Sequence, residues 1–276
     1  MKIFVCLPFF VLFSIFMPGN GEAFVPQAPH LLHLVIEKIK QPVGIETFQT
    51  KKILNYQDPD KEVIELKERL IYKNPGRVRS EILSDHSISF SVESDLGFVK
   101  VVNGVIVTHE KPLADLYTDI LFYRDYQSLL NQISLAGVDT GKVTFQRYKD
   151  TVCYVIGRSL GKGKPFTSLW IEKDTVFPVK YVVRKNGLLI EFFYHNWKRI
   201  SRTWYPMQVR IFLDNQLFAT VDVQRVDLKS GFPASLFDIE YIQRLYPVND
   251  PDSLDENSKQ IDELDKGMEN FKKLYE

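Results

Sequence analysis

The chain has 276 residues, 45% of them hydrophobic and 13% aromatic, and its 35 basic and 35 acidic residues give a formal net charge of zero. This composition excludes a charge-rich disordered chain and argues against a nucleic-acid binder that is basic overall. It also excludes a membrane protein with many spans, because the one long apolar run lies at the extreme N-terminus. The length fits one large domain or two small ones.

Residues 1–23 have the layout of a secretory signal peptide. Lys2 precedes the apolar run 3–17, and the small residues Gly21 and Ala23 occupy positions −3 and −1 of a cleavage site after Ala23. The run of about 15 residues is shorter than the ~20 needed to span a bilayer, so export is favoured over the alternative of a retained anchor. The mature chain then keeps one cysteine, Cys153, which we expect to be a buried strand thiol.

The pattern after the leader begins with one helix and continues mainly as strands. Apolar residues at helical spacing predict an amphipathic helix over 29–40, stopped by Pro42 and Gly44. Alternating apolar and polar residues then predict strands over 64–73, 77–82, 88–93, 98–102 and 105–108. The dipeptide Asn103-Gly104 predicts a tight hairpin turn, and 74–76 predicts a second turn.

The second half of the chain repeats this order, with helical spacing first and strands after it. Residues 112–136 have helical spacing, in two short helices, and strands resume over 143–149, 151–158, 167–173, 178–184, 188–197, 204–213 and 218–228. A hairpin is expected at Asn186-Gly187. The prediction is a mainly β protein with some α, in which about eleven strands form one strongly curved antiparallel sheet.

Residues 249–276 differ from the rest of the chain. They contain nine acids and four lysines, a net charge of −5, so that residues 24–248 carry +5. Leu254, Ile261, Leu264 and Met268 are separated by seven, three and four positions, which allows an amphipathic helix. A solvated, frayed terminus is the other interpretation. We therefore expect three parts: a signal peptide at 1–23, a sheet domain at 24–248 and an acidic tail at 249–276.

No catalytic or metal-binding constellation stands out in the sequence. It contains no His-Glu-x-x-His, Gly-x-Ser-x-Gly or Cys-x-x-Cys motif. His30 and His33 lie three apart on the first helix without a third ligand nearby, and the loop 161–165 resembles a phosphate loop only superficially. We expect no enzyme activity, no metal and no cofactor. A curved sheet with few helices can instead enclose an apolar ligand cavity, or its side chains can fill that space.

Several segments resemble the periplasmic lipoprotein carriers of the LolA/LolB type. The run 74–79 (Asn-Pro-Gly-Arg-Val-Arg) resembles their Pro-Gly-(Arg/Lys)-Phe-Arg segment, with Val78 in place of the usual aromatic residue. Residues 31–52 resemble their opening helix and first strand. The segments 169–172, 178–180 and 187–193 resemble their later strands. The resemblance covers roughly residues 29–240.

The resemblance implies an unclosed antiparallel barrel whose concave face is covered by helices acting as a lid. It also implies a periplasmic carrier that binds acyl chains of lipoproteins, or another lipid, and moves them toward the outer membrane of a Gram-negative-type bacterium. An inner-membrane transporter and an outer-membrane acceptor would be the partners of such a carrier, which we expect to be a monomer that binds no nucleic acid. Arg79 would hold the lid or a headgroup, or would be a surface arginine.

The expected lipid-binding residues combine strand and helix positions of this barrel. They are Leu31, Leu34, Val35, Arg79, Phe90, Leu116, Ile120, Phe192, Tyr194, Met207, Val209 and Ile211. The alternative function is a sensor or interaction module on the same fold, whose contact with a partner depends on lipid or lipoprotein. The acidic tail favours that alternative somewhat.

Overall fold

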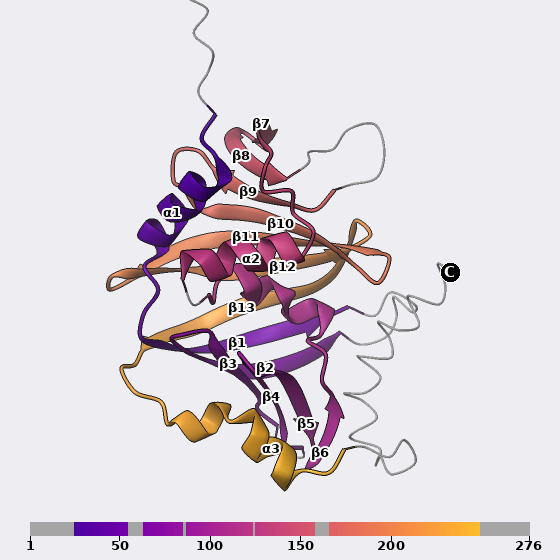
Figure 1. The fold of residues 1–276 in the computed structure, drawn as a ribbon. Coiled ribbons are helices and arrows are strands. Elements are labelled where there is room, and N and C mark those ends of the chain that lie inside the picture. Colours follow the sequence, from indigo (N-terminus) through magenta and orange to yellow (C-terminus); the bar gives the residue numbers. More distant parts are fainter. Residues whose placement is uncertain (1–24, 55–62, 85–86, 124, 158–165, 249–276) are drawn as a thin grey trace, which may run out of the picture.

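Thirteen antiparallel strands form one sheet, shown in Figure 1, in the order β6-β5-β4-β3-β2-β1-β13-β12-β11-β10-β9-β8-β7. The computed structural model describes residues 25–54, 63–84, 87–123, 125–157 and 166–248. The predicted leader, the loop 161–165 and the acidic tail lie outside these residues. The sheet does not close, because β6 and β7 stand at opposite ends of the strand order.

The strands and helices have the following bounds. The strands are β1 (Gly44–Ile53), β2 (Ile64–Lys73), β3 (Arg77–Ile82), β4 (Ser89–Ser94), β5 (Gly97–Val102), β6 (Val105–Thr108), β7 (Val143–Tyr148), β8 (Thr151–Gly157), β9 (Ser168–Glu172), β10 (Pro178–Lys185), β11 (Leu188–Ile200), β12 (Thr203–Leu213) and β13 (Gln216–Leu228). The helices are α1 (Ala28–Ile39), the 3₁₀ helices η1 (Leu113–Ile120) and η2 (Ala234–Phe237), α2 (Tyr126–Leu135) and α3 (Ile239–Leu245).

Tight turns set the register between neighbouring strands. Asn103 and Gly104 have φ of 49° and 81°, and Asn186 and Gly187 have φ of 53° and 80°. Two consecutive residues with positive φ are characteristic of the two-residue turn whose twist matches that of the strands. The hairpins expected at both dipeptides are therefore confirmed. The turn expected at 74–76 is confirmed as well.

Local sequence signals begin and end the helices. Pro29 stands in the first turn of α1, and Lys40 ends that helix in the left-handed conformation. Asp125 caps α2 by accepting a hydrogen bond from the backbone N–H of Ser128, while the Ser128 hydroxyl accepts one from the Asp125 backbone. These two helices and η1 confirm the expected helical regions at 29–40 and 112–136.

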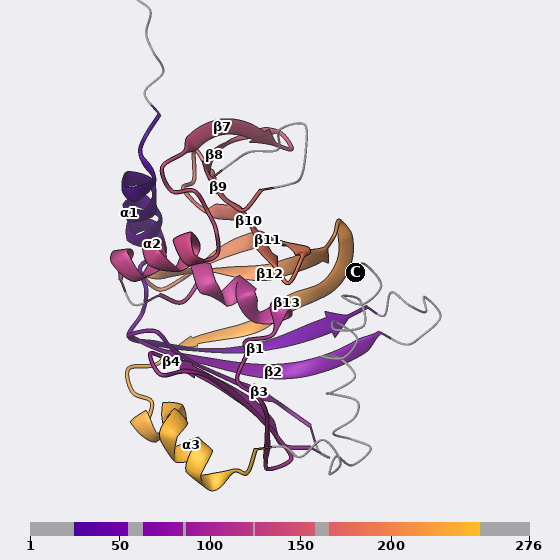
Figure 2. The same cartoon turned by 45° about the vertical axis from the view of Figure 1, so that its right-hand side comes forward.

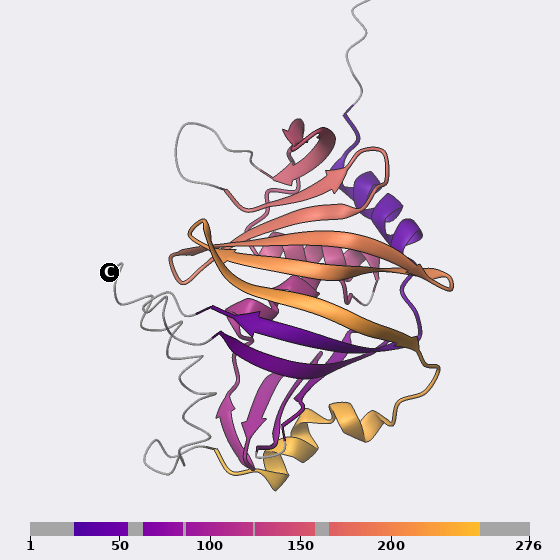
Figure 3. The ribbon, with the colours of Figure 1, turned by 180° about the vertical axis from the view of Figure 1, so that it is seen from behind.

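Helices lie on both faces of the curved sheet (Figure 2). On the concave face, α1, η1 and α2 pack against β7–β13, β1 and β2 through a continuous apolar core. On the outer face, η2 and α3 cover β2–β6 through a smaller cluster that includes Ile71, Val92 and Ile242. Seen from behind (Figure 3), the outer face of β10–β13, β1 and β2 is turned to the viewer and α3 lies beside its lower end.

The segment between β6 and β7 crosses the whole concave face. It connects the two edge strands of the sheet, β6 and β7, and η1 and α2 form its middle. Residues 247 and 248, which follow α3, also lie at the β6 edge. The Ile106 N–H donates to the Pro247 carbonyl at 2.8 Å, and Val248 bridges Ile106 in parallel. The free edge of β6 is thereby paired with the chain's own C-terminal segment.

The structure confirms the predicted fold class and extends it in two places. The sheet has thirteen strands instead of about eleven. The sequence also did not predict the outer helices η2 and α3, because α3 spans seven residues and its buried pair Ile239 and Ile242 offers a single helical repeat. Cys153 is a buried strand thiol, as expected.

Candidate functional site

The 3₁₀ helix η1 lies in the hollow of the sheet. It runs for eight residues, which is long for a 3₁₀ helix, because such runs rarely exceed three or four residues. Tyr117 and Ile120 are buried at 2% and 1% exposure. The Tyr194 hydroxyl donates to the Tyr117 carbonyl at 2.9 Å, and the Gln49 amide donates to the Tyr117 hydroxyl at 2.8 Å.

A buried charge cluster ties the first turn of η1 to the sheet. The Lys51 ammonium lies 2.6 Å from Asp115 of η1 and 3.3 Å from Glu68 of β2. Burial alone would lower the pKa of Lys51, but the two carboxylates raise it overall, so Lys51 stays charged. Burial alone would likewise raise the pKa of Asp115, yet attraction by Lys51 lowers it below the ordinary value of 3.8. Ser80 completes the cluster by donating to Glu68.

A second charge cluster holds the last turn of η1. The Lys111 ammonium lies 2.6 Å from Asp119 and 2.7 Å from Glu93 of β4. Burial raises the pKa of Asp119, and the nearby Glu93 adds to the effect against the attraction of Lys111. The pKa of Lys111 is raised by the two carboxylates against the opposing effect of burial. In this structure, buried ion pairs therefore connect η1 to the sheet at both of its ends.

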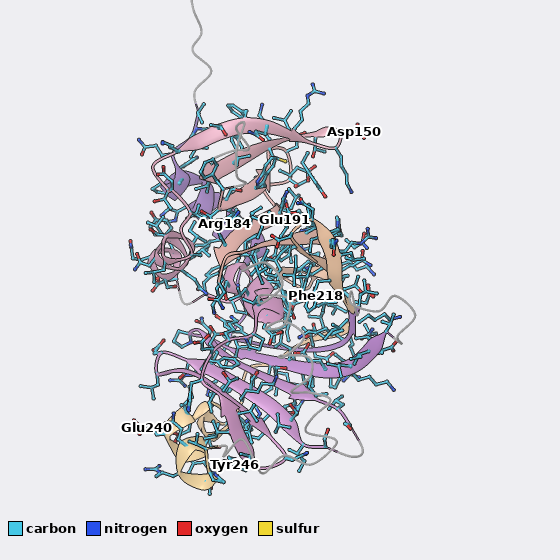
Figure 4. The ribbon with its side chains drawn as sticks, turned by 90° about the vertical axis from the view of Figure 1, so that its right-hand side faces the viewer. Asp150, Arg184, Glu191, Phe218, Glu240 and Tyr246 are labelled. Carbon is cyan, nitrogen blue, oxygen red and sulfur yellow. The ribbon has the colours of Figure 1, made fainter. Side chains whose placement is uncertain are left out.

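A cavity of about 70 Å³ lies between η1 and the strands β1–β5. By water-sized volumes it has room for on the order of five water molecules. Its lining is mostly apolar and also includes three serines and four charged residues. The lining residues are Lys51, Ile53, Leu66, Glu68, Ser80, Ile82, Ser89, Phe90, Ser91, Lys100, Pro112, Ala114, Asp115 and Phe218. Phe218 is labelled in Figure 4, which shows the side of the molecule where β1 ends and β13 begins.

A smaller cavity of about 20 Å³ adjoins the first. The two share Glu68, Ser80, Ser91 and Asp115, and the smaller one extends to Glu93 and Lys111 at the second charge cluster. The space under η1 is therefore a partly polar channel along β2–β4. Over β7–β13, in contrast, the interior is packed with apolar and tyrosine side chains such as Ile190 and Tyr181.

Most of the predicted lipid-binding residues lie in or against the concave core. Those fully buried in it are Leu31, Val35, Ile120, Phe192, Tyr194, Val209 and Ile211. Leu116 packs against the same core from η1, while Leu34 and Met207 are half-buried. The structure thus brings helix and strand positions together under one helical layer, as the amphipathic patterns indicated.

Arg79 and Phe90 lie apart from the other predicted site residues. The Arg79 guanidinium stacks over the Phe90 ring at 4.1 Å, donates to the Leu236 carbonyl at 3.1 Å and pairs with Glu81 at 2.6 Å. The Phe90 ring belongs to the outer cluster, although Phe90 also borders the cavity. In the structure Arg79 therefore holds the outer segment η2, and the expected contact with the inner lid is not among its described interactions.

The residues that sequence reasoning missed are the polar ones under η1. The sequence patterns did not single out Lys51, Glu68 or Asp115, because a pattern cannot distinguish an inward from an outward charge without the register. One signal was available: Lys51 and Glu68 both occupy the same alternation as apolar neighbours, Ile53 and Leu70.

The histidines that the structure describes are not grouped into a metal site. Within the described ranges, no group of three or more His, Cys, Asp or Glu residues is placed to hold a metal ion. His33 instead stacks on Tyr126 of α2, with ring centroids 4.1 Å apart. No helix in the described part of the chain is long and apolar enough to cross a membrane.

Comparison with known proteins finds similarity in structure only. No protein-family model matches the chain, and no curated protein matches its sequence. A DUF1329 family protein from Desulfovibrio piger matches with a TM-score of 0.52 and 14% identity, covering 78% of this chain and 98% of that one. A LolA superfamily protein from Nitrosomonas europaea matches with a TM-score of 0.52 and 13% identity, covering 79% of this chain and 100% of that one.

A third structure, described as a domain of an outer membrane lipoprotein-sorting protein from Vibrio parahaemolyticus, matches with a TM-score of 0.49 and 11% identity, covering 78% of this chain and 97% of that one. At these identities the likeness concerns the fold. The unclosed antiparallel sheet with helices on its concave face is therefore a LolA-like fold, as the sequence resemblance predicted.

Proposed function

We propose that this protein is a lipid carrier that shields the acyl chains of a lipoprotein, or of another lipid, between its curved sheet and the helices on the concave face. The observation that carries the proposal is the apolar layer of α1, η1 and α2 against the open sheet, with a cavity at its margin. A chain of ~15 methylenes costs on the order of 12 kcal/mol in water, so its transfer through an aqueous space requires a shielded site.

The described structure is a closed form for such a ligand. An acyl chain of ~15 methylenes is several times larger than a space for about five water molecules. Binding therefore requires η1 and α2 to move from the hollow, and the apolar residues that they now cover, such as Ile190 and Val209, become the ligand contacts. Lid movements of this kind gate many binding sites.

The proposal includes the cellular setting. Residues 1–23 would direct export to the periplasm with cleavage after Ala23, and residues 24–248 would form the binding domain. An inner-membrane transporter would load the carrier and an outer-membrane acceptor would unload it. The protein would act by binding, without a chemical step.

Uptake of a fluorescent acyl probe by delipidated protein tests the proposal. Ala114 is buried and lines the cavity, so Ala114→Leu should fill the cavity and weaken uptake. Ala234→Leu, at an exposed position of the outer helix η2, should leave uptake unchanged. A native mass spectrum of the purified protein should show a bound acyl ligand. Absence of both a copurified ligand and probe uptake would contradict the proposal.

A second candidate function is a lipid-responsive sensor. It is favoured by the segment after α3, which pairs with the β6 edge through Val248 just before the acidic residues 249–276. Deletion of 249–276 separates the two functions. A carrier should retain its lipid affinity after the deletion, while a sensor should lose its partner.

A further inference from the structure

The floor of the main cavity is a polar strip across three neighbouring strands. Ser80 of β3 lies opposite Ser91 of β4, which lies opposite Lys100 of β5. Ser89 stands two residues before Ser91 and therefore shares its face. Side chains of the same strip thus point into one space under η1, and all four line the cavity.

Two of these serines have unused hydrogen-bonding capacity. Ser89 is only 3% exposed and Ser91 is half-buried, and neither hydroxyl has a hydrogen-bond partner among the residues that the structure describes. Each hydroxyl offers one donor and two acceptor sites. Buried polar groups are normally paired, so a hydroxyl that is open to a cavity indicates a partner within that cavity.

The charges around the cavity balance one another. Lys51 is paired with both Glu68 and Asp115, and Lys100 is close enough to Asp115 to lower the pKa of that carboxyl. The lining thus holds two cations and two anions. An anionic ligand would face the two carboxylates and a cationic one the two lysines, so a neutral polar group fits best.

The remainder of the lining is apolar. Ile53, Leu66 and Phe218 lie at the ends of β1, β2 and β13, next to the serine strip, and Pro112 and Ala114 cover them from the η1 side. The cavity therefore has an apolar wall on one side and a row of serine hydroxyl groups on the other. Pockets that combine apolar walls with a few convergent polar groups fix the orientation of a ligand through the polar groups.

We propose that this cavity is a headgroup subsite for a neutral, hydroxyl-bearing lipid, with glycerol or sugar hydroxyls bonded to Ser89 and Ser91 and the acyl chain leaving along the apolar wall. The inference rests on the proposed lipid-binding function and adds a ligand class to it. It also assigns roles within the cavity: the two serines bind the headgroup, and the paired charges disfavour fatty acids and other anions.

Calorimetric titration of delipidated full-length protein with three probes tests the inference. Monooctanoylglycerol should bind at least about tenfold more tightly than octanoate, which has the same chain and an anionic head. Glycerol alone should give no measurable binding, which distinguishes a lipid headgroup from a free polyol. The double variant S89A/S91A should lose about tenfold in affinity for monooctanoylglycerol, because two neutral hydrogen bonds are removed, while its affinity for octanoate is unchanged.

Ser235→Ala on the outer helix η2 is the matched control and should bind all probes as the wild type does. Equal binding of monooctanoylglycerol and octanoate by the wild type would overturn the headgroup subsite and leave the lipid-carrier function standing. Failure of both lipids to bind would overturn both. Unchanged glyceride affinity in the folded double variant would overturn the role of the serines. Should that variant fail to fold, the ranking of the probes by the wild type still decides the proposal.

Discussion

The buried cluster of Lys51, Glu68 and Asp115 leads to a strong prediction about stability. Replacing Lys51 by Met keeps most of the volume but removes the cation that pairs with both Glu68 and Asp115. The side chains of Lys51 and Glu68 are 7% and 2% exposed, so water screens them little. Removal of one partner from a buried ion pair costs about 3–5 kcal/mol.

The magnitude can be followed by thermal and urea unfolding. For a domain of this size, 1 kcal/mol corresponds to about 2–4 °C, so K51M should lower the melting temperature by about 6–20 °C. Amide hydrogen exchange should become faster in η1, which Asp115 then no longer ties to β1. The triple variant K51M/E68Q/D115N removes all three charges and should recover much of the loss, because neutral groups of similar volume replace the ions.

Lys52 provides the control on the same strand. Its ammonium lies 3.4 Å from Glu65, but both side chains are about half exposed, at 47% and 52%. Exposed pairs contribute ~0.2–1 kcal/mol, so K52M should have little effect. If K51M were no more destabilising than K52M, or if the triple variant were less stable than K51M, the buried cluster would not hold η1 as described.

Three further predictions follow from single residues. The folded state holds the pKa of Asp115 below its ordinary value of 3.8. The ionised carboxylate therefore stabilises the fold at a pH above its unfolded pKa, and this stabilisation is lost as the pH falls through the folded pKa. Urea unfolding should show that the stability advantage of the wild type over D115N shrinks below about pH 4. Gly157 has φ of +105° and a Cβ there would lie 2.5 Å from the Thr167 carbonyl oxygen, so G157A should lower the melting temperature by several degrees. Burial raises the pKa of Cys153, so native protein should react with a thiol reagent much more slowly than urea-unfolded protein, and equal rates would contradict its burial.

The fold could be predicted from the sequence because local patterns agree with it. Local signals favour the conformation that each segment has in the fold. They include the alternation of apolar residues along β11 and β12, the Asn-Gly turns and the capping residues of α2. The apolar members of the candidate site followed from the same alternation. Phe192 and Val209, for example, share the buried face of their strands.

The polar part of the site could not be predicted in the same way. Lys51 looks like a surface residue, because strand lysines are usually exposed. Its burial depends on Asp115, which is 64 residues away in sequence, and on the path of η1 through the hollow. Similarly, the contact of Arg79 with η2 depends on where the segment after β13 packs. Contacts between distant segments require the tertiary arrangement, which a single sequence pattern does not contain.

The segment that joins β6 to β7 has a mechanical consequence. Because it starts at one edge of the sheet and ends at the other, it spans the curved sheet as a chord spans an arc. The segment has a fixed number of residues, so moving η1 and α2 away from the sheet draws the two edge strands together. Entry of a ligand beneath η1 would then bring β6 and β7 closer and tighten the curvature of the sheet. Distances between spin labels on the two edge strands should shorten on ligand binding.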